Sequence, residues 1–280
     1  MAPKLTLAHS PDPDDAFMFY ALSQEHIPTD GLRFQQVLAD IETLNQRARQ
    51  SAYDITAISF HAYAYLHERY ALLRCGSSFG DGYGPLIVAR KGVGLKASAL
   101  GRARMAVPGP LTTAALLLQL HSPGVQTVSI PFDQIPAAVA EKRVDAGVLI
   151  HEGQLTFAAS GLEKVLDLGA WWKQQTGLPV PLGGNAVRRD LSADLVARIA
   201  AVLRRSIQYA LDHRPQALAY ALGFGRGLSP ELADRFVGMY VNQWTLDAGP
   251  DGQRAIQLLL DRAFDARLIP ARVPLELLPP

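Results

Sequence analysis

The sequence contains a single cysteine, Cys75, among its 280 residues. No disulfide can therefore form within the chain, and a zinc site built from several thiolates is excluded. Long apolar runs are also missing, since no uncharged stretch approaches the roughly 20 residues that span a bilayer. The opening residues MAPKLTLAHSPDPDD lack the apolar core of a secretion signal. We expect a cytoplasmic protein without a membrane partner.

The chain has no excess of either charge, because it contains 27 Lys and Arg residues and 26 Asp and Glu residues and its net charge is +1. Nucleic-acid binding needs concentrated positive charge, so no such partner is predicted. The glycine-rich strings GDGYG and GFGRG match neither the dinucleotide fingerprint nor the phosphate loop, and no H-E-x-x-H pair occurs. We predict neither a metal nor an organic cofactor.

The pattern that is present alternates strand-like and helix-like segments, which predicts an α/β fold with mainly parallel sheets. One series contains KLTLA, LRFQQVLA and YDITAIS, and a second contains ARMAVPG, VQTVSIPF and VDAGVLI. Two lobes are expected, the first from residues 1–90 and 185–280 and the second from residues 91–184. Three amphipathic helices are predicted near the C-terminus, at roughly 191–212, 229–244 and 250–267.

Polar residues stand where two predicted strands end: Ser59 closes YDITAIS and His151 follows VDAGVLI. In open parallel sheets, ligands collect outside the carboxyl ends of the strands, so both side chains are expected to face one cleft. A neutral imidazole accepts a proton near pH 7, which makes His151 a candidate general base. Glu152 either orients that imidazole or caps the next turn.

His9 also ends a predicted strand and is a rival for the base. The following acidic string, SPDPDD, favours the protonated form of His9 and weakens it in that role. The carboxylates of the string are themselves predicted to satisfy the first amides of a helix.

Two hydroxyls, those of Thr112 and Thr113, stand at the predicted start of a helix in AVPGPLTTAALLL. Unpaired amides and the helix dipole at such a place can hold a carboxylate or a phosphate. The alternative is that one threonine only caps the helix. The same two alternatives apply to Ser59.

A set of longer strings resembles the 1,4-dihydroxy-6-naphthoate synthases of the futalosine route to menaquinone, in motif order and in spacing. The resemblance runs from about residue 5 to about residue 270. The strings are SPDPDDAFMFYAL, DIETLNQRA, YDITAISFHAYAYL, GSSFGDGYGPLIVAR, VPGPLTTA, DAGVLIHEGQLTF, DLGAWWKQQTGLPVPLGGNAVRRDL and YVNQWTLDAG.

This resemblance implies a two-lobed fold like that of type II periplasmic binding proteins, used as a cytoplasmic carbon-carbon lyase without metal or organic cofactor. It implies a small-molecule substrate, cyclic dehypoxanthinyl futalosine, that yields 1,4-dihydroxy-6-naphthoate and dihydroxyacetone. By the family pattern His151 is the general base. The positions that match substrate-binding residues are Ala57, Ile58, Ser59, Thr112 and Thr113, and Asn45 and Ser78 lie in matching motifs as further candidates.

Two alternatives remain open at this point. The same architecture commonly traps solutes, so the chain could be a non-catalytic protein that binds a small anion. A sister enzyme with the same fold is chorismate dehydratase, although SPDPDDAFMFYAL and LIHEGQ favour the synthase. The sequence leaves the oligomeric state open.

Overall fold

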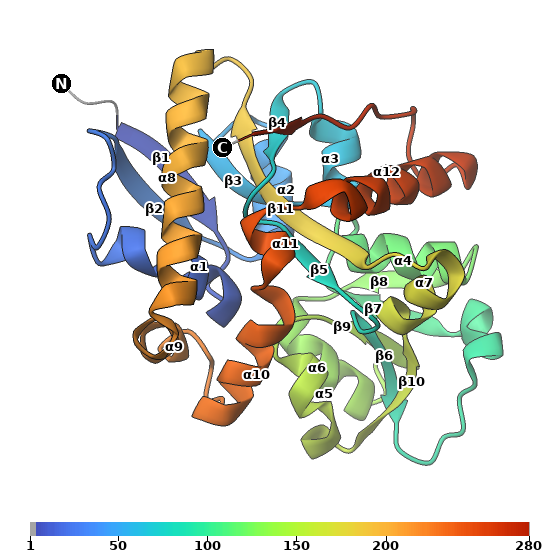
Figure 1. The fold of residues 1–280 in the computed structure, drawn as a ribbon. Coiled ribbons are helices and arrows are strands. Elements are labelled where there is room, and N and C mark those ends of the chain that lie inside the picture. The colour runs from blue at the N-terminus through green and yellow to red at the C-terminus, as the bar shows by residue number, and fades with distance from the viewer. Residues whose placement is uncertain (1–3, 280) are drawn as a thin grey trace.

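The computed structural model describes residues 4–279, which form two β-sheets with helices packed on them (Figure 1). The first sheet has the strand order β12-β4-β11-β3-β1-β2, and β5 is attached to β11. Its strands are β1 (Lys4–His9), β2 (Arg33–Leu38), β3 (Ile55–Ser59), β4 (Tyr70–Leu73), β5 (Ser78–Gly80), β11 (Val180–Arg188) and β12 (Leu277–Leu278). Because β1 pairs in parallel with both β2 and β3, their carboxyl ends meet at one edge.

The second sheet has the order β10-β6-β9-β7-β8. Its strands are β6 (Leu86–Arg90), β7 (Arg104–Val107), β8 (Gln126–Ser129), β9 (Ala146–Leu149) and β10 (Leu162–Asp167). β7 pairs in parallel with β8 and β9, whereas β6 runs antiparallel to β9 and β10. The ends of β7 and β9 therefore point the same way, and the segments that carry Thr112 and His151 leave the sheet side by side.

The helices of the first part of the chain are α1 (Pro13–Ser23), α2 (Ile41–Ala48), α3 (Phe60–Leu66), α4 (Thr113–His121), α5 (Ile135–Ala140), α6 (Gly153–Thr156) and α7 (Leu168–Thr176), with short 3₁₀ turns η1 (Ala97–Arg102), η2 (Phe132–Gln134) and η3 (Phe157–Ser160). The C-terminal helices are α8 (Ala193–Asp212), α9 (Arg214–Leu222), α10 (Pro230–Tyr240), α11 (Gln243–Leu246) and α12 (Gly249–Asp265). None of the helices within residues 4–279 combines the length and the apolarity needed to cross a bilayer.

The prediction of three C-terminal helices is wrong in two places. α9 was missed: His213 leaves helical geometry after α8, and Pro215 sits in the first turn of a new helix, where its missing amide is harmless. The helix expected to run to residue 244 ends at Tyr240, because Asn242 caps a separate helix through a reciprocal capping box with Thr245.

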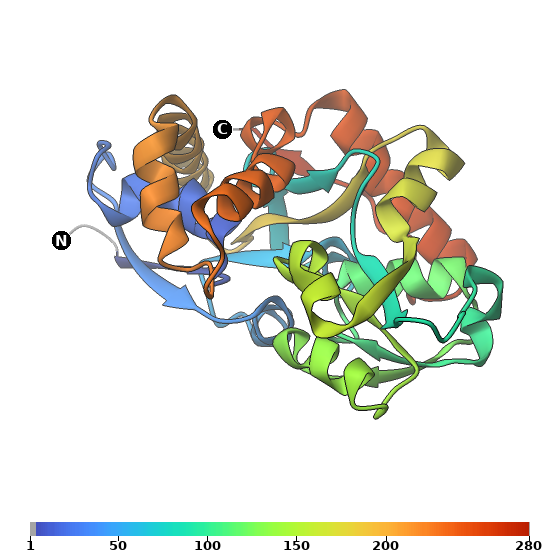
Figure 2. The ribbon, with the colours of Figure 1, turned by 90° about the horizontal axis from the view of Figure 1, so that it is seen from below.

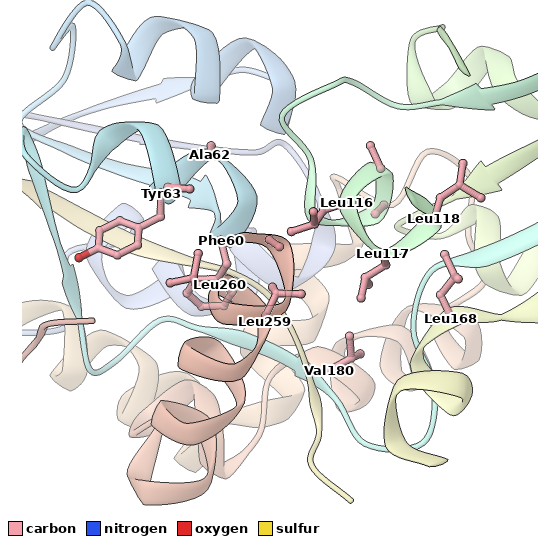
Figure 3. Close-up of a cluster of buried hydrophobic side chains, with 14 of the residues drawn as sticks. Phe60, Ala62, Tyr63, Leu116, Leu117, Leu118, Leu168, Val180, Leu259 and Leu260 are labelled. Atoms are coloured by element: carbon pink, nitrogen blue, oxygen red, sulfur yellow. The ribbon is translucent and has the colours of Figure 1, made fainter. Parts of the chain in front are cut away.

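One apolar core connects the two sheets (Figure 3). Phe60 of α3, Leu117 of α4 and Leu260 of α12 are fully buried in it, together with residues of both sheets. Truncating a buried phenylalanine such as Phe60 to alanine costs about 3–5 kcal/mol. Because this core holds α3 against α4, the N-terminal ends of these two helices lie next to each other.

A second core lies under α1, α8 and α9, on the side of the first sheet shown in orange and blue in Figure 2. Phe17 and Phe19 of α1 are fully buried there. Cys75 belongs to the same core, where its thiol faces the Ala200 carbonyl of α8 at 3.8 Å. Burial raises the pKa of the Cys75 thiol to about 12.

Glycines allow close packing where the chain passes from the first sheet to the second. A Cβ added at Gly84 would lie 2.9 Å from the Gly169 Cα, and one added at Gly80 would lie 2.0 Å from the Tyr83 carbonyl oxygen. Since β6 pairs within the second sheet and β11 within the first, we propose two units divided near the predicted boundaries at residues 90 and 185, with crossings over residues 81–85 and 177–179.

Candidate functional site

A pocket lies where the two sheets approach each other, lined by the ends of β3 and β9 and by the beginnings of α1 and α4. The pocket contains about 750 Å³ of space, including open solvent at its mouth. Its lining combines apolar side chains such as Ile58 and Phe236 with polar ones such as Ser59 and His151, which is typical of a small-molecule site.

Most of the residues predicted from the sequence line this one pocket. They are Ala57, Ile58, Ser59, Ser78, Thr112, Thr113 and His151. Asn45 differs, because it is fully buried and is not one of the lining residues. Its Nδ2 donates to the Ser59 hydroxyl at 3.1 Å and its Oδ1 accepts from the Ser59 amide at 2.9 Å, so it holds Ser59 from behind.

His151 stands where β9 turns into α6, with a left-handed backbone at φ 53°. Histidine adopts this region more readily than most residues, and its use here turns the chain sharply after the strand. The Nδ1 atom lies 3.2 Å from Oδ2 of Asp12. The Nε2 atom is enclosed and has no hydrogen-bond partner. The edge of the ring meets Phe132, with the ring centroids 4.9 Å apart.

Asp12 does not cap α1, contrary to the prediction for the acidic string. It occupies the N-cap position, but its side chain makes no capping hydrogen bond. The carboxylate instead contacts His151, Ser10 and Arg226. Burial opposes its ionisation, yet His151, the Ser10 hydroxyl and Arg226 together outweigh burial and hold the pKa of Asp12 below its ordinary value.

Arg226, in the loop between α9 and α10, joins three parts of the chain. Its Nη1 lies 2.6 Å from Oδ1 of Asp12 and 2.8 Å from Oε1 of Glu152, and its guanidinium lies 4.8 Å from the centre of the Phe132 ring. Neither predicted role of Glu152 is observed: its side chain makes no capping hydrogen bond, and its charged partner is Arg226 rather than the imidazole of His151.

The prediction that His9 is favoured in its protonated form is wrong. Burial lowers the pKa of His9, and this effect exceeds the opposing contributions of the Ser10 carbonyl, Gln36 and Asp12. Its Nδ1 lies 2.9 Å from the Ser10 carbonyl oxygen and its Nε2 lies 3.2 Å from Oε1 of Gln36. Both ring nitrogens have hydrogen-bond partners, and His9 is not among the residues that line the pocket.

The two threonines have different tasks. Thr112 caps α4, because its hydroxyl accepts from the Ala115 amide at 3.2 Å and donates to the Gly109 carbonyl at 2.7 Å. The Thr113 hydroxyl donates to the Leu182 carbonyl of β11 at 2.5 Å. The first helical hydrogen bond of α4 is donated by the Leu116 amide. The amides of Thr113 and Ala114, two residues that line the pocket, therefore have no acceptor within the helix.

Sequence reasoning missed Asp12, Asp14 and Arg226. The two aspartates were visible in SPDPDD, but their side-chain directions were assigned to capping. Arg226 lies in GFGRG, which was compared only with nucleotide-binding motifs. Within residues 4–279 no group of three or more His, Cys, Asp or Glu side chains is arranged to hold a metal ion.

Residues 5–265 match the family model described as menaquinone biosynthesis. The chain is 42% identical over 270 residues to the 1,4-dihydroxy-6-naphthoate synthase of Thermus thermophilus, which covers 96% of this chain and 97% of that one. It is 37% identical over 279 residues to the enzyme of the same name from Streptomyces coelicolor, and the match covers 98% of this chain and 97% of that one.

Among solved structures, a protein from Archaeoglobus fulgidus is similar with a TM-score of 0.90 and 46% identity, covering 95% of this chain and 98% of that one. The alkanesulfonate-binding protein of Xanthomonas axonopodis, bound to MOPS, is similar with a TM-score of 0.74 and 13% identity, covering 98% and 96%. This second likeness confirms the predicted periplasmic-binding-protein fold. Both the family model and the relatives cover nearly the whole sequence, and the chain therefore belongs to the menaquinone biosynthesis family.

Proposed function

We propose that the protein is a 1,4-dihydroxy-6-naphthoate synthase, a carbon-carbon lyase. Its substrate is then cyclic dehypoxanthinyl futalosine, and its products are 1,4-dihydroxy-6-naphthoate and dihydroxyacetone. The names of the two relatives at 42% and 37% identity support this activity, as does the order of motifs along the chain. The observation that carries the chemistry is the unpartnered Nε2 of His151 in the pocket.

His151 acts as the general base in this proposal. The negative charge of Asp12, 3.2 Å from Nδ1, favours a proton on Nδ1 and leaves the lone pair on Nε2. The Nε2 atom then takes a proton from a carbon atom of the bound substrate. Asp12 is a positioning residue, because it fixes the tautomer and the orientation of the ring without contact to the substrate.

The removal of this proton builds negative charge on the substrate, and hydrogen-bond donors must meet it. The amides of Thr113 and Ala114, at the positive end of the α4 dipole, are suited to an oxyanion or a carboxylate. Ser59 precedes α3, whose N-terminal end lies beside that of α4, and it is fixed by Asn45. Both threonine hydroxyls are already hydrogen-bonded, so we assign substrate contact at this end to the amides first.

The proposed base and its partner Asp12 are largely shielded from water. The side chain of His151 is only 16% exposed, and that of Asp12 is 1% exposed. In such an enclosed site, fixed dipoles act more strongly than in solution. Carbon-carbon cleavage leaves an aromatic naphthoate, and aromatisation provides much of the thermodynamic driving force.

The direct experiment is to incubate the purified protein with cyclic dehypoxanthinyl futalosine and, separately, with chorismate. We expect the absorbance of the dihydroxynaphthoate to appear only with the first compound, together with an equal amount of dihydroxyacetone. Loss of water from chorismate would instead identify the sister dehydratase. Tight binding of the futalosine derivative without turnover would identify a binding protein.

A further inference from the structure

A second acid reaches the pocket beside His151. Asp14 is the second residue of α1 and lines the same pocket as the imidazole. The residue is only 8% exposed. Its Oδ1 atom is enclosed and has no hydrogen-bond partner. A buried polar atom in this condition is unusual in a folded protein and calls for an explanation.

Stabilisation of the helix does not explain it. An acidic side chain in the first turn of a helix is favourable when it is solvated or pairs with the free amides. Asp15, its neighbour, does accept a backbone hydrogen bond, from the Ser10 amide at 2.7 Å. Asp14 has an enclosed oxygen without a partner instead, and the residue lines the pocket.

The charged groups around Asp14 decide its protonation state. Asp12 and Asp15 of the same segment are negative neighbours, His151 faces it from the β9–α6 turn, and the Tyr240 phenol faces it from α10. The positive charge of Arg226 is taken up by Asp12 and Glu152.

Helices α8 and α9 also pack against α1. The guanidinium of Arg214 in α9 lies over the ring of Phe17, and the Ser206 hydroxyl of α8 donates to the Met18 carbonyl oxygen. Burial and then the charges of Asp15 and Asp12 raise the pKa of Asp14 above its ordinary value. A carboxyl group in this environment keeps its proton at a pH where an exposed one is ionised.

We propose that Asp14 is a catalytic acid that works opposite the base His151. This inference rests on the proposed function. Each hydroxyl of a 1,4-dihydroxynaphthalene is the enol form of a ring ketone, so an oxygen must gain a proton when a neighbouring carbon loses one. Two carboxyls, those of Asp14 and Asp15, line the pocket, and Asp15 is held by the Ser10 amide. The unpartnered enclosed atoms among the lining residues are Nε2 of His151 and Oδ1 of Asp14.

The step balances without any further reactant. The carbon-hydrogen bond breaks and its proton moves to Nε2, while its electron pair forms the new carbon-carbon double bond. The π pair of the carbonyl group becomes an O–H bond to the proton from Asp14. The substrate stays at the same charge and oxidation state, and the enzyme is left with an imidazolium and a carboxylate. In the following step a proton passes from the imidazolium of His151 to the carboxylate of Asp14, and both groups return to their starting state.

The test compares Asp14→Asn with Asp40→Asn. The amide at position 14 can still donate a hydrogen bond but cannot release a proton. Asp40 caps α2 at the surface, and asparagine caps equally well, so that variant makes the same chemical change outside the pocket. We expect Asp14→Asn to lower kcat by about 10²–10⁴-fold with KM within about threefold of the wild type. In the wild type and in Asp40→Asn, kcat should fall at high pH because the acid loses its proton. This fall should be absent in Asp14→Asn.

A kcat of Asp14→Asn close to that of the wild type, or a change confined to KM, would overturn the proposal. Infrared difference spectra between acidic and alkaline pH, recorded for the wild type and for Asp14→Asn, provide a readout that needs no turnover. Burial also raises the pKa of Asp15 to about 7, so the variant is needed to assign the band. A protonated carboxylic C=O band that is missing in Asp14→Asn should persist above neutral pH in the wild type, and its absence would also overturn the proposal. If the wild type fails to convert the futalosine derivative while this band is present, the proposed function fails but the assignment of a protonated acid does not.

Discussion

The carboxylate of Asp12 and the imidazole of His151 come from different sheets and lie 3.2 Å apart at the pocket. Asp12 follows β1 of the first sheet, and His151 follows β9 of the second. The pair therefore exists only while the two sheets hold their present spacing. In the proposed mechanism, the orientation of the base depends on a contact between the two sheets.

Replacing His151 with alanine tests the base directly. We expect kcat to fall by about 10²–10⁴-fold, because no other enclosed imidazole nitrogen lines the described pocket. Affinity for the substrate, measured by isothermal titration calorimetry, should stay within about tenfold of the wild type. His67→Ala, at the end of α3 and outside the pocket lining, is the matched control. Unchanged turnover in His151→Ala would remove the base from the mechanism.

Replacing Asp12 with asparagine tests the positioning role. The amide can occupy the same space, but it no longer favours the tautomer with the proton on Nδ1. We expect kcat to fall by about 10²-fold or more while KM changes little. Nitrogen-15 NMR of the labelled imidazole should show a shift of the proton from Nδ1 toward Nε2. If the tautomer is the same in both proteins, Asp12 does not act in this way.

Arg226 is predicted to hold the two sheets together through Asp12 and Glu152. Arg226→Gln removes the positive charge beside the enclosed carboxylate of Asp12 and breaks the link to Glu152. We expect kcat to fall by about tenfold or more and the radius of gyration in small-angle X-ray scattering to increase. Arg254→Gln, which breaks an exposed pair with Asp251 on α12, should change neither quantity. A compact, fully active Arg226→Gln protein would contradict the prediction.

Asn45 is predicted to act through Ser59. Asn45→Ala leaves the Ser59 amide without its acceptor at 2.9 Å, and an unsatisfied buried group of this kind costs about 1–3 kcal/mol. We expect the free energy of unfolding in urea to fall by that amount and KM to rise. Asn45→Asp retains an acceptor for the Ser59 amide, and at about pH 4 or below its buried carboxyl is protonated and carries no charge, so its loss of stability measured there should be smaller. Equal losses in the two variants would show that the amide contact is unimportant.

The acid at position 14 also predicts how stability depends on pH. Its pKa is raised in the folded state, so the unfolded chain releases this proton at a lower pH than the folded protein does. The contribution of Asp14 to stability is complete below the unfolded pKa, about 4, and is lost as the pH rises through the folded pKa. Asp14→Asn removes this loss. Its advantage in urea midpoint over the wild type should grow from about pH 5 to about pH 8, and parallel curves would disprove the shift.

The sequence was informative where backbone position decides function. Ser59 ends β3 and His151 follows β9, and parallel strands deliver their carboxyl ends to one edge, so both could be expected at a common pocket. A threonine cap on α4 was one of the two alternatives that the local spacing left open, and Thr112 provides it. These predictions needed only the period of the strands and the chemistry of helix ends.

The rest depended on contacts between distant segments. Nothing in the local sequence shows that Asp12 turns from its helix to the imidazole, because that direction is set by Arg226, which arrives from the loop before α10. His9 was misjudged for a similar reason. Its acidic neighbours along the chain suggested a raised pKa, but burial under the packed helices has the larger effect and lowers it.

The enclosure of Cys75 has a practical consequence for measuring motion between the sheets. Its side chain is inaccessible, and its thiolate form is suppressed because burial raises the pKa to about 12. Thiol-reactive dyes should therefore leave the native chain unmodified. Leu38, at the end of β2 in the first sheet, is 47% exposed, and Val93, in the loop after β6 of the second sheet, is 48% exposed. Cysteines introduced at these two positions would carry a fluorescent donor and acceptor on an otherwise unlabelled background, and energy transfer between them would follow opening and closing in single molecules.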